Sequence, residues 1–128
     1  MIVVDTSVWV SALRSPGSPE APFLVELLDA DEVGLAIPVR VELFSGASTA
    51  DRAKLRRTLS ALPVLYPTDE TWALIDRWVE LSARKGHRFA IGDLLIGAMA
   101  AEQGALVWSL DADFARMAAI GLVGRYET

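Results

Sequence analysis

Five acidic residues of this chain stand beside apolar segments, where a carboxylate needs a partner. They are Asp5, Glu42, Asp93, Asp111 and Asp113. A buried carboxylate without a partner is costly and takes up a proton instead. A divalent cation keeps such a group ionised, and carboxylate oxygens are the ligands that Mg²⁺ and Mn²⁺ prefer. The five acids therefore indicate a site for a hard divalent cation.

The pattern of apolar runs predicts how the fold brings these acids together. Short β-forming runs alternate with amphipathic segments, so we expect one α/β domain over residues 1–128. It has three layers, α/β/α, around a parallel sheet of four to five strands. The expected strands are 2–4, 33–37, 63–66 and 105–109, with 122–126 as a fifth. The expected helices run from Thr6 or Ser7 to Leu13 and over 20–30, 38–46, 50–61, 69–85, 91–103 and 110–121.

Three of the acids follow expected strands directly. Asp5 comes after the first strand, and Asp111 and Asp113 come shortly after the fourth. Ligands of open parallel sheets bind outside the carboxyl ends of the strands. We therefore expect these three carboxylates to meet at one edge of the sheet, although most of the chain separates them.

The other two acids lie in expected helices. Asp93 belongs to the apolar segment IGDLLIGAMA, and its helix face continues with Gly97, Ala100 and Ala101. These small residues allow a neighbouring element to approach closely, with the carboxylate at one end of the contact. Glu42 lies between two apolar residues in a helix that we expect to pack on the sheet.

Each acid taken alone also has an ordinary structural explanation. Asp5 and Asp111 are suited to cap helices, and Asp113 to a first helical turn, where the helix dipole favours an acid. Glu42 and Asp93 have a different one.

The ordinary explanation for Asp93 is an ion pair, and for Glu42 it is an ion pair or exposure to solvent. Glu42 has Arg40 nearby in the sequence, and Asp93 has Arg88 and Arg116 as candidate partners. The joint pattern is harder to explain in this way. Four or five acids beside apolar runs, all assignable to one sheet edge, favour a metal site.

Composition limits the other kinds of site. The 128 residues are 52% hydrophobic and carry a formal net charge of −5, and removing the five acids leaves 12 acids against 12 bases. The acidity therefore belongs to the site rather than to the surface. No cysteine is present, and His87 is the only histidine, so disulfides and structural zinc sites are excluded. The chain shows no signal peptide and no membrane span, and we expect a soluble cytoplasmic protein.

The order and spacing of the acids resemble a known family. The resemblance rests on Asp5-Thr6-Ser7 after the first strand, Glu42 in the third helix, Asp93 in a later helix, and SLDADF at 109–114. Together these look like a PIN-domain ribonuclease, and most like the VapC toxins of bacterial and archaeal toxin–antitoxin pairs. The resemblance covers nearly the whole chain, whereas any one motif by itself is weak.

The resemblance implies specific roles for these side chains. Asp5, Glu42, Asp93 and Asp111 match the acidic quartet that binds one or two Mg²⁺ or Mn²⁺ ions and carries catalysis, and Asp113 matches a further acid of many members.

Hydroxyl groups are expected beside this quartet. Thr6, Ser7 and Ser109 match the hydroxyl positions of the family. Two departures are minor: Ser109 stands where threonine is common, and Gly97 where alanine is common. Neither departure removes a ligand.

The chemistry expected of such a site is phosphodiester hydrolysis. A bound metal supplies hydroxide near neutral pH and neutralises charge on the phosphate. No Ser–His–Asp or Cys–His arrangement competes with it, because the chain has one histidine and no cysteine. The resemblance implies a metal-dependent endoribonuclease, the toxin of a type II toxin–antitoxin pair, which leaves 5′-phosphate and 3′-hydroxyl ends. It also implies a homodimer and a VapB-like antitoxin that covers the acidic site.

An acidic site repels RNA unless basic residues surround it. The candidates are Arg14, Arg40, Arg84, Lys85 and Arg88, with the cluster 52–57 as a further group. For any single one of them, a solvated helix face is the ordinary explanation. His87 is expected in a loop. Of the four tryptophans, Trp9 and Trp108 fit the core, while Trp72 and Trp78 fit a helix face or a subunit interface.

Other function classes fit less well. A phosphoacceptor receiver domain needs a lysine at the end of a late strand, and neither Lys54 nor Lys85 ends a strand. A haloacid-dehalogenase-type phosphatase needs a second aspartate where Ser7 stands. The main alternative is a non-catalytic PIN-like module that binds or sequesters RNA. Loss of one or more acids would be typical of such a module, and none is missing.

Overall fold

The short apolar runs of the chain form one parallel sheet. The computed structural model describes residues 1–128, and its five strands have the order β3-β2-β1-β4-β5. The strands are β1 Ile2–Val4, β2 Val33–Ala36, β3 Val64–Leu65, β4 Leu106–Trp108 and β5 Gly124–Arg125. The helices are α1 Thr6–Arg14, α2 Glu20–Asp29, α3 Ile37–Gly46, α4 Thr49–Ser60, α5 Asp69–Arg84, α6 Ile91–Glu102 and α7 Ala112–Ala119. Every strand and helix expected from the sequence is present, with ends that differ by a few residues.

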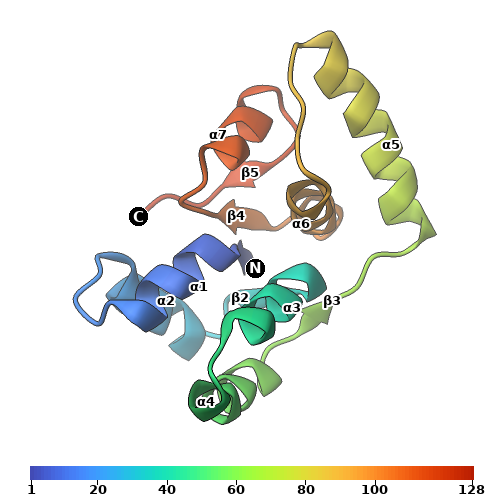
Figure 1. Ribbon diagram of the computed structural model, residues 1–128. Helices are drawn as coiled ribbons and strands as arrows, with labels where there is room; N and C mark the ends of the chain where they lie inside the picture. Colours follow the sequence, from blue (N-terminus) through green and yellow to red (C-terminus); the bar gives the residue numbers. More distant parts are fainter.

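The helices cover both faces of the sheet, which confirms the three-layer α/β/α fold. Figure 1 shows α1 and α2 on one side of the strands and α5 and α6 on the other. The right-handed rule for crossovers accounts for this division. The chain moves from β1 to β3 in one direction across the sheet and then returns to β4 and β5 in the other. None of the seven helices is both long and apolar enough to cross a lipid bilayer.

The reversal of direction places a topological switch point between β1 and β4. These strands pair in parallel, with Val3 opposite Val107 and Val4 opposite Trp108. The backbone N–H of Asp5 extends the pairing by donating to the carbonyl of Trp108 over 2.8 Å. Residues that follow the two strands therefore emerge side by side, at the position where ligands of such sheets bind.

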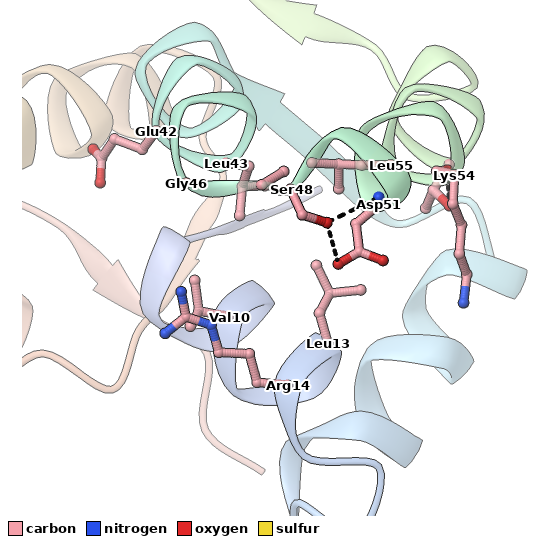
Figure 2. Close-up of a pocket in the computed structure, with 12 residues that line it drawn as sticks. Val10, Leu13, Arg14, Glu42, Leu43, Gly46, Ser48, Asp51, Lys54 and Leu55 are labelled. Atoms are coloured by element: carbon pink, nitrogen blue, oxygen red, sulfur yellow. Dashed lines mark hydrogen bonds between the residues drawn. The ribbon is translucent and has the colours of Figure 1, made fainter.

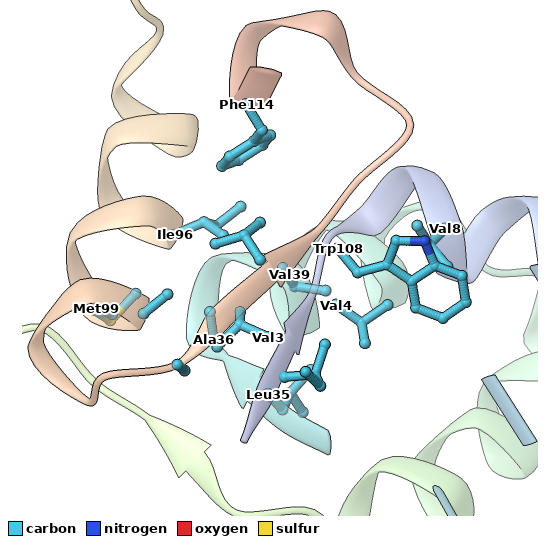
Figure 3. Close-up of a cluster of buried hydrophobic side chains, with 14 of the residues drawn as sticks. Val3, Val4, Val8, Leu35, Ala36, Val39, Ile96, Met99, Trp108 and Phe114 are labelled. Carbon is cyan, nitrogen blue, oxygen red and sulfur yellow. The ribbon is translucent and has the colours of Figure 1, made fainter. Parts of the chain in front are cut away.

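The core lies around the central strands. Val3 and Val4 are fully buried, and Figure 3 shows them among side chains from α3, α6 and α7. Trp9 and Trp108 are buried at 1% and 4% exposure, as expected from the sequence. β1 is buried along its whole length because it is covered on both faces.

The first turn of α1 differs from the sequence-based expectation. We predicted Thr6 or Ser7 as the N-cap, but the helix begins at Thr6 and Asp5 occupies the N-cap position. The side chain of Asp5 makes no capping hydrogen bond. Its carboxylate is engaged elsewhere, as the site shows below.

Helix α6 packs unusually closely against its neighbours. A Cβ atom at Gly97 would lie 2.9 Å from Cε of Met117, 3.1 Å from Cγ1 of Val123 and 3.3 Å from Cζ3 of Trp78. The absent side chain at Gly97 thus lets α6 lie against α5, α7 and the segment before β5. This contact sets how closely α6 packs against these elements. It thereby positions Asp93, which lies in the first turn of α6.

We expect Gly97→Val to destabilise the protein by about 2 kcal/mol, because the new side chain overpacks a filled contact. Gly46→Val is the matched control, since a Cβ at Gly46 meets nothing within 4 Å. Denaturant unfolding of both variants and the wild type measures the difference. Equal loss of stability in both variants would show that the contact at Gly97 is not the cause.

Candidate metal-binding active site

Three carboxylates converge at the sheet edge beyond β4. One carboxylate oxygen from each of Asp93, Asp111 and Asp113 lies within 4.8 Å of the other two. Asp93 comes from the first turn of α6, and Asp111 and Asp113 come from the start of α7. Oxygen ligands of a single hard cation lie at comparable separations, so the fold brings these groups together at a spacing that suits a metal.

Asp5 lies at the end of β1 beside this cluster and is held by hydroxyl groups. It is 6% exposed, and its Oδ2 accepts hydrogen bonds from Oγ of Ser7 at 2.8 Å and from Oγ of Ser109 at 2.7 Å. These two bonds stabilise the ionised form and fix the orientation of the carboxylate. They leave Oδ1 free of side-chain hydrogen bonds and available to a ligand.

The same two serines join the ends of β1 and β4. Oγ of Ser7 accepts from the backbone N–H of Leu110 at 3.0 Å, and Oγ of Ser109 accepts from the N–H of Asp111 at 2.9 Å. Each hydroxyl therefore links one acidic segment to the other. Thr6 has a different environment, because its Oγ1 is buried and has no hydrogen-bond partner.

Glu42 approaches the site from another direction. The sequence left both burial on the sheet and exposure to solvent open for Glu42, and the structure shows it exposed. The reason is helical periodicity: α3 turns Val39 and Leu43 into the core, and Glu42 falls outside that stripe. Its Oε1 lies 4.0 Å from the place of a Cβ at Gly92, so its carboxylate lies close to the first turn of α6.

The pKa of Asp93 is affected by all four of the other acids. Its pKa is raised from 3.8 to about 6, first because burial disfavours the charged form. The carboxylates of Asp111, Asp5, Asp113 and Glu42 each raise the pKa further. The four other acids singled out from the sequence are therefore the ones that act on Asp93. Perturbed pKa values of this kind are typical of functional sites.

The ordinary structural explanations hold for the acids of α7 and, through its exposure to solvent, for Glu42, but not for Asp93. Asp111 caps the helix, accepting from the N–H of Asp113 at 2.9 Å, and Asp113 pairs with Arg116. Asp93 forms an ion pair with neither Arg88 nor Arg116. Capping and pairing thus leave Asp93 without compensation.

Arg40 does not pair with Glu42 either. Its guanidinium lies over the ring of Phe44, 5.6 Å from the centroid, and Arg56 lies 5.1 Å from the same centroid. This double cation–π contact was not predicted, because it depends on how α4 folds back on α3. It leaves the charge of Glu42 uncompensated.

Comparison with known proteins identifies the family. The family model described as PIN domain matches residues 2–120, a range that contains all five acids. The chain belongs to the PIN-domain family. The resemblance stated from the acidic motifs is thereby confirmed.

Relatives of this PIN domain are named as ribonucleases. The chain is 33% identical over 119 residues to VapC ribonuclease Mb1587 of Mycobacterium bovis, covering 89% of each chain. It is 37% identical over 123 residues to ribonuclease VapC18 of Mycobacterium tuberculosis, covering 91% of this chain and 87% of the relative. The PIN domain is thus similar to these relatives over nearly its whole length.

Solved structures agree with the fold. VapBC2 from Rickettsia felis, bound to a DNA fragment from its promoter, matches with a TM-score of 0.76 at 18% identity, over 98% of each chain. VapBC-5 from Mycobacterium tuberculosis, a member of the VapBC family of toxin–antitoxin systems, matches with a TM-score of 0.69 at 27% identity, over 98% of this chain and 97% of that one.

The basic residues expected to contact RNA come from several elements of the PIN domain. None of the five is engaged in an ion pair. Arg14 ends α1, Arg84 ends α5, and Lys85 and Arg88 belong to the turn that leads to α6. Arg40 is held on Phe44. Their positive charges are therefore available to a polyanion.

A groove that the sequence did not reveal opens beside Glu42. It has a volume of about 200 Å³ and lies between α1, α3 and α4. Figure 2 shows Val10, Leu13 and Leu55 lining it, with Arg14 on α1 and Glu42 at the far side of α3. Leu13 is 52% exposed, so it presents apolar surface to the groove. The groove thus joins an apolar surface to the acidic site.

The raised pKa of Asp93 predicts how pH affects stability. The folded chain holds this proton more tightly than the unfolded chain, so metal-free stability falls as pH rises from about 4 through about 6. Asp93→Asn removes this loss. In EDTA at pH 7.5 we expect the free energy of unfolding of the variant to exceed that of the wild type by on the order of 1 kcal/mol, after solvent screening is taken into account. Denaturant unfolding measures this difference.

The difference in stability between the wild type and Asp93→Asn should vanish below pH 4, where residue 93 is neutral in both proteins. Asp76→Asn is the matched control, because Asp76 is an exposed acid on α5 far from the cluster in sequence. A gap between wild type and Asp93→Asn that stays constant from pH 4 to 8 would contradict the electrostatic explanation.

Proposed function

We propose that this PIN domain, residues 1–128, is a metal-dependent endoribonuclease of the VapC type. The observation that carries the proposal is the convergence of acids from four separate segments on one sheet edge, at the switch point between β1 and β4. We assign metal binding and catalysis to Asp5, Glu42, Asp93 and Asp111, with Asp113 as a further ligand. The names of the relatives support the same activity.

The donor set fits Mg²⁺ or Mn²⁺. Every candidate ligand is a carboxylate oxygen, and no sulfur or imidazole is close enough in the cluster to select a softer metal. The unpaired charge of Asp93 has the same implication, because burial without a cation raises its pKa. Three oxygens within 4.8 Å suit one ion, and Asp5 and Glu42 extend the set toward a second.

When bound, the metal supplies an activated water and neutralises charge on the scissile phosphate. The residues of the chain hold the geometry. Ser7 and Ser109 fix one oxygen of Asp5 and leave the other directed to the ligand. The expected products carry a 5′-phosphate and a 3′-hydroxyl. We assign the RNA backbone to the basic residues named above, of which Arg14 lines the same groove as Glu42.

We further propose a VapB-like antitoxin as the regulator. The groove between α1, α3 and α4 is lined by Glu42, so an apolar peptide segment that fills it ends beside the acids. Such a partner would cover the acidic site. The homodimer and the cytoplasmic location remain predictions from the resemblance.

Cleavage of total RNA tests the function. With Mg²⁺ or Mn²⁺ we expect discrete cuts by the wild type and at least a hundredfold lower rate for Asp5→Asn and Asp93→Asn, because each loses a charged ligand. Asp76→Asn, which lies outside the cluster, should cut as the wild type does. Sequencing of the RNA ends identifies the cut sites and the position of the phosphate.

Two controls separate loss of chemistry from loss of fold. Circular dichroism should show native helix content in both Asn variants, and calorimetric titration with Mn²⁺ should show weaker binding. Equal cutting by wild type and variants would reject the assigned site. Tight RNA binding without any cutting, under several metals, would favour the non-catalytic RNA-binding module.

Leu13→Glu tests the antitoxin groove. We expect this change to weaken the complex with the cognate antitoxin by at least tenfold, because it places a charge on an apolar contact. RNA cleavage by the free protein should not change. Val25→Glu is the matched control, since Val25 is similarly exposed on α2 and lies outside the groove. Equal weakening by both changes would place the antitoxin elsewhere.

A further inference from the structure

A second cavity lies where α5 ends and α6 begins. Its volume is about 290 Å³, near the lower end of the range for small-ligand sites. The turn between the two helices, visible at the top of Figure 1, forms one side of it. Four of its lining residues are apolar and three are polar: Val79, Ala83, Phe89 and Leu94, with Ser82, His87 and Arg88.

Ser82 is the unexplained group of this cavity. Its side chain is 2% exposed, lines the cavity, and has no hydrogen-bond partner for Oγ. A buried hydroxyl without a partner costs free energy, and such groups in native proteins call for an explanation. A ligand that offers a donor or an acceptor in the cavity would satisfy it.

Two aromatic side chains, His87 and Phe89, also line the cavity. The rings of His87 and Phe89 are stacked, with centroids 5.6 Å apart and planes inclined by 7°. The N–H of His87 donates to the carbonyl of Ser82 over 2.9 Å, which ties the turn to α5. The aromatic surface and the buried hydroxyl are therefore held in a fixed relation before any ligand binds. A planar, partly apolar ligand with a hydrogen-bonding edge suits this pair of features.

The charges at the rim are positive. Arg88 lines the cavity, and Arg84 and Lys85 are exposed at the end of α5. None of the three forms an ion pair with a carboxylate. A ligand that carries phosphate is attracted here, in contrast to the acidic cluster next to it.

The cavity adjoins the proposed catalytic site. Leu94 lines it and directly follows Asp93 in the first turn of α6. Adjacent Cα atoms lie about 3.8 Å apart, so one helical turn carries both an acid of the cluster and a leucine that lines the cavity. The cavity therefore lies beside the acidic cluster.

We propose that this cavity binds one nucleobase of the RNA substrate, adjacent to the bond that is cut. The base stacks on the aromatic surface of His87 and Phe89, and its edge forms a hydrogen bond with Ser82. Arg88 contacts a flanking phosphate. This inference rests on the proposed ribonuclease function and assigns it a specificity-determining subsite. Stacking on aromatic rings and hydrogen bonds to a base edge are the usual means of reading unpaired RNA.

Nucleoside binding tests the subsite without any cleavage. Adenosine, guanosine, cytidine and uridine are titrated in EDTA into the ¹⁵N-labelled wild type, and ribose, which carries neither base nor phosphate, serves as the control. We expect saturable amide shifts at residues 82, 87, 89 and 94 for some bases more than others, and none for ribose. Absence of these shifts, or equal shifts with free indole and with every base, would overturn the proposal.

Ser82→Ala separates a binding role from a structural one. We expect the variant to bind the preferred nucleoside roughly two- to tenfold more weakly, the usual effect of one lost hydrogen bond. Its thermal stability should be equal to that of the wild type or higher, because an unpaired buried hydroxyl is removed and alanine favours a helix. Ser60→Ala, at the exposed end of α4 and outside the cavity, should leave nucleoside binding unchanged. Full binding by Ser82→Ala would exclude Ser82 as the base contact and overturn the proposal.

Sequencing of cut sites links the subsite to the activity. Ser82→Ala and Arg88→Ala should broaden the base preference beside the cut, whereas Arg77→Ala, at an exposed position of α5 outside the cavity, should not. If the wild type cuts RNA and all variants share one preference, the subsite is wrong and the ribonuclease stands. If nothing is cut while nucleosides still bind in the cavity, the ribonuclease function is wrong and base binding stands.

Discussion

Mutual repulsion among five carboxylates is the constraint that the rest of the structure has to satisfy. Left to themselves, these side chains would move apart into water or take up protons. The pairing of β1 with β4 opposes this, because it brings Asp5 and the segment 109–113 to the same height on the sheet. The serines then anchor Asp5 from both strands. Burial first, and then repulsion by the other four carboxylates, raise the pKa of Asp93, and the metal-free fold leaves both effects uncompensated.

The scaffold holds this arrangement by close packing. α6 is positioned through Gly97 against three elements, and its first turn carries Asp93 on one side and Leu94 on another. α7 begins with a side-chain cap from Asp111 to the N–H of Asp113. A carboxylate whose position is set by packing and capping needs little reorganisation when a cation binds, and this rigidity is a general requirement of metal sites.

The sequence predicted most of the fold and the members of the acidic cluster, for identifiable reasons. Short β-forming runs followed by Asp5 and Asp111 leave few topologies, and those topologies place both acids at one edge. The sequence left the exposure of Glu42 open, because its apolar neighbours suggested burial, whereas the buried stripe of the helix runs through Val39 and Leu43. The groove and the cavity were not predictable. They depend on how helices far apart in sequence meet, and Ser82 looks like any polar residue of an amphipathic helix until its neighbours are known.

The bond between Ser109 and Asp5 joins residues 104 positions apart in the chain. During synthesis, Asp5 emerges early and has no partner strand until most of the protein has followed it. β4 is also the strand that places Asp111 and Asp113. The acidic cluster is therefore assembled only after β4 has been made and has paired with β1, so no shorter part of the chain carries the complete set of acids.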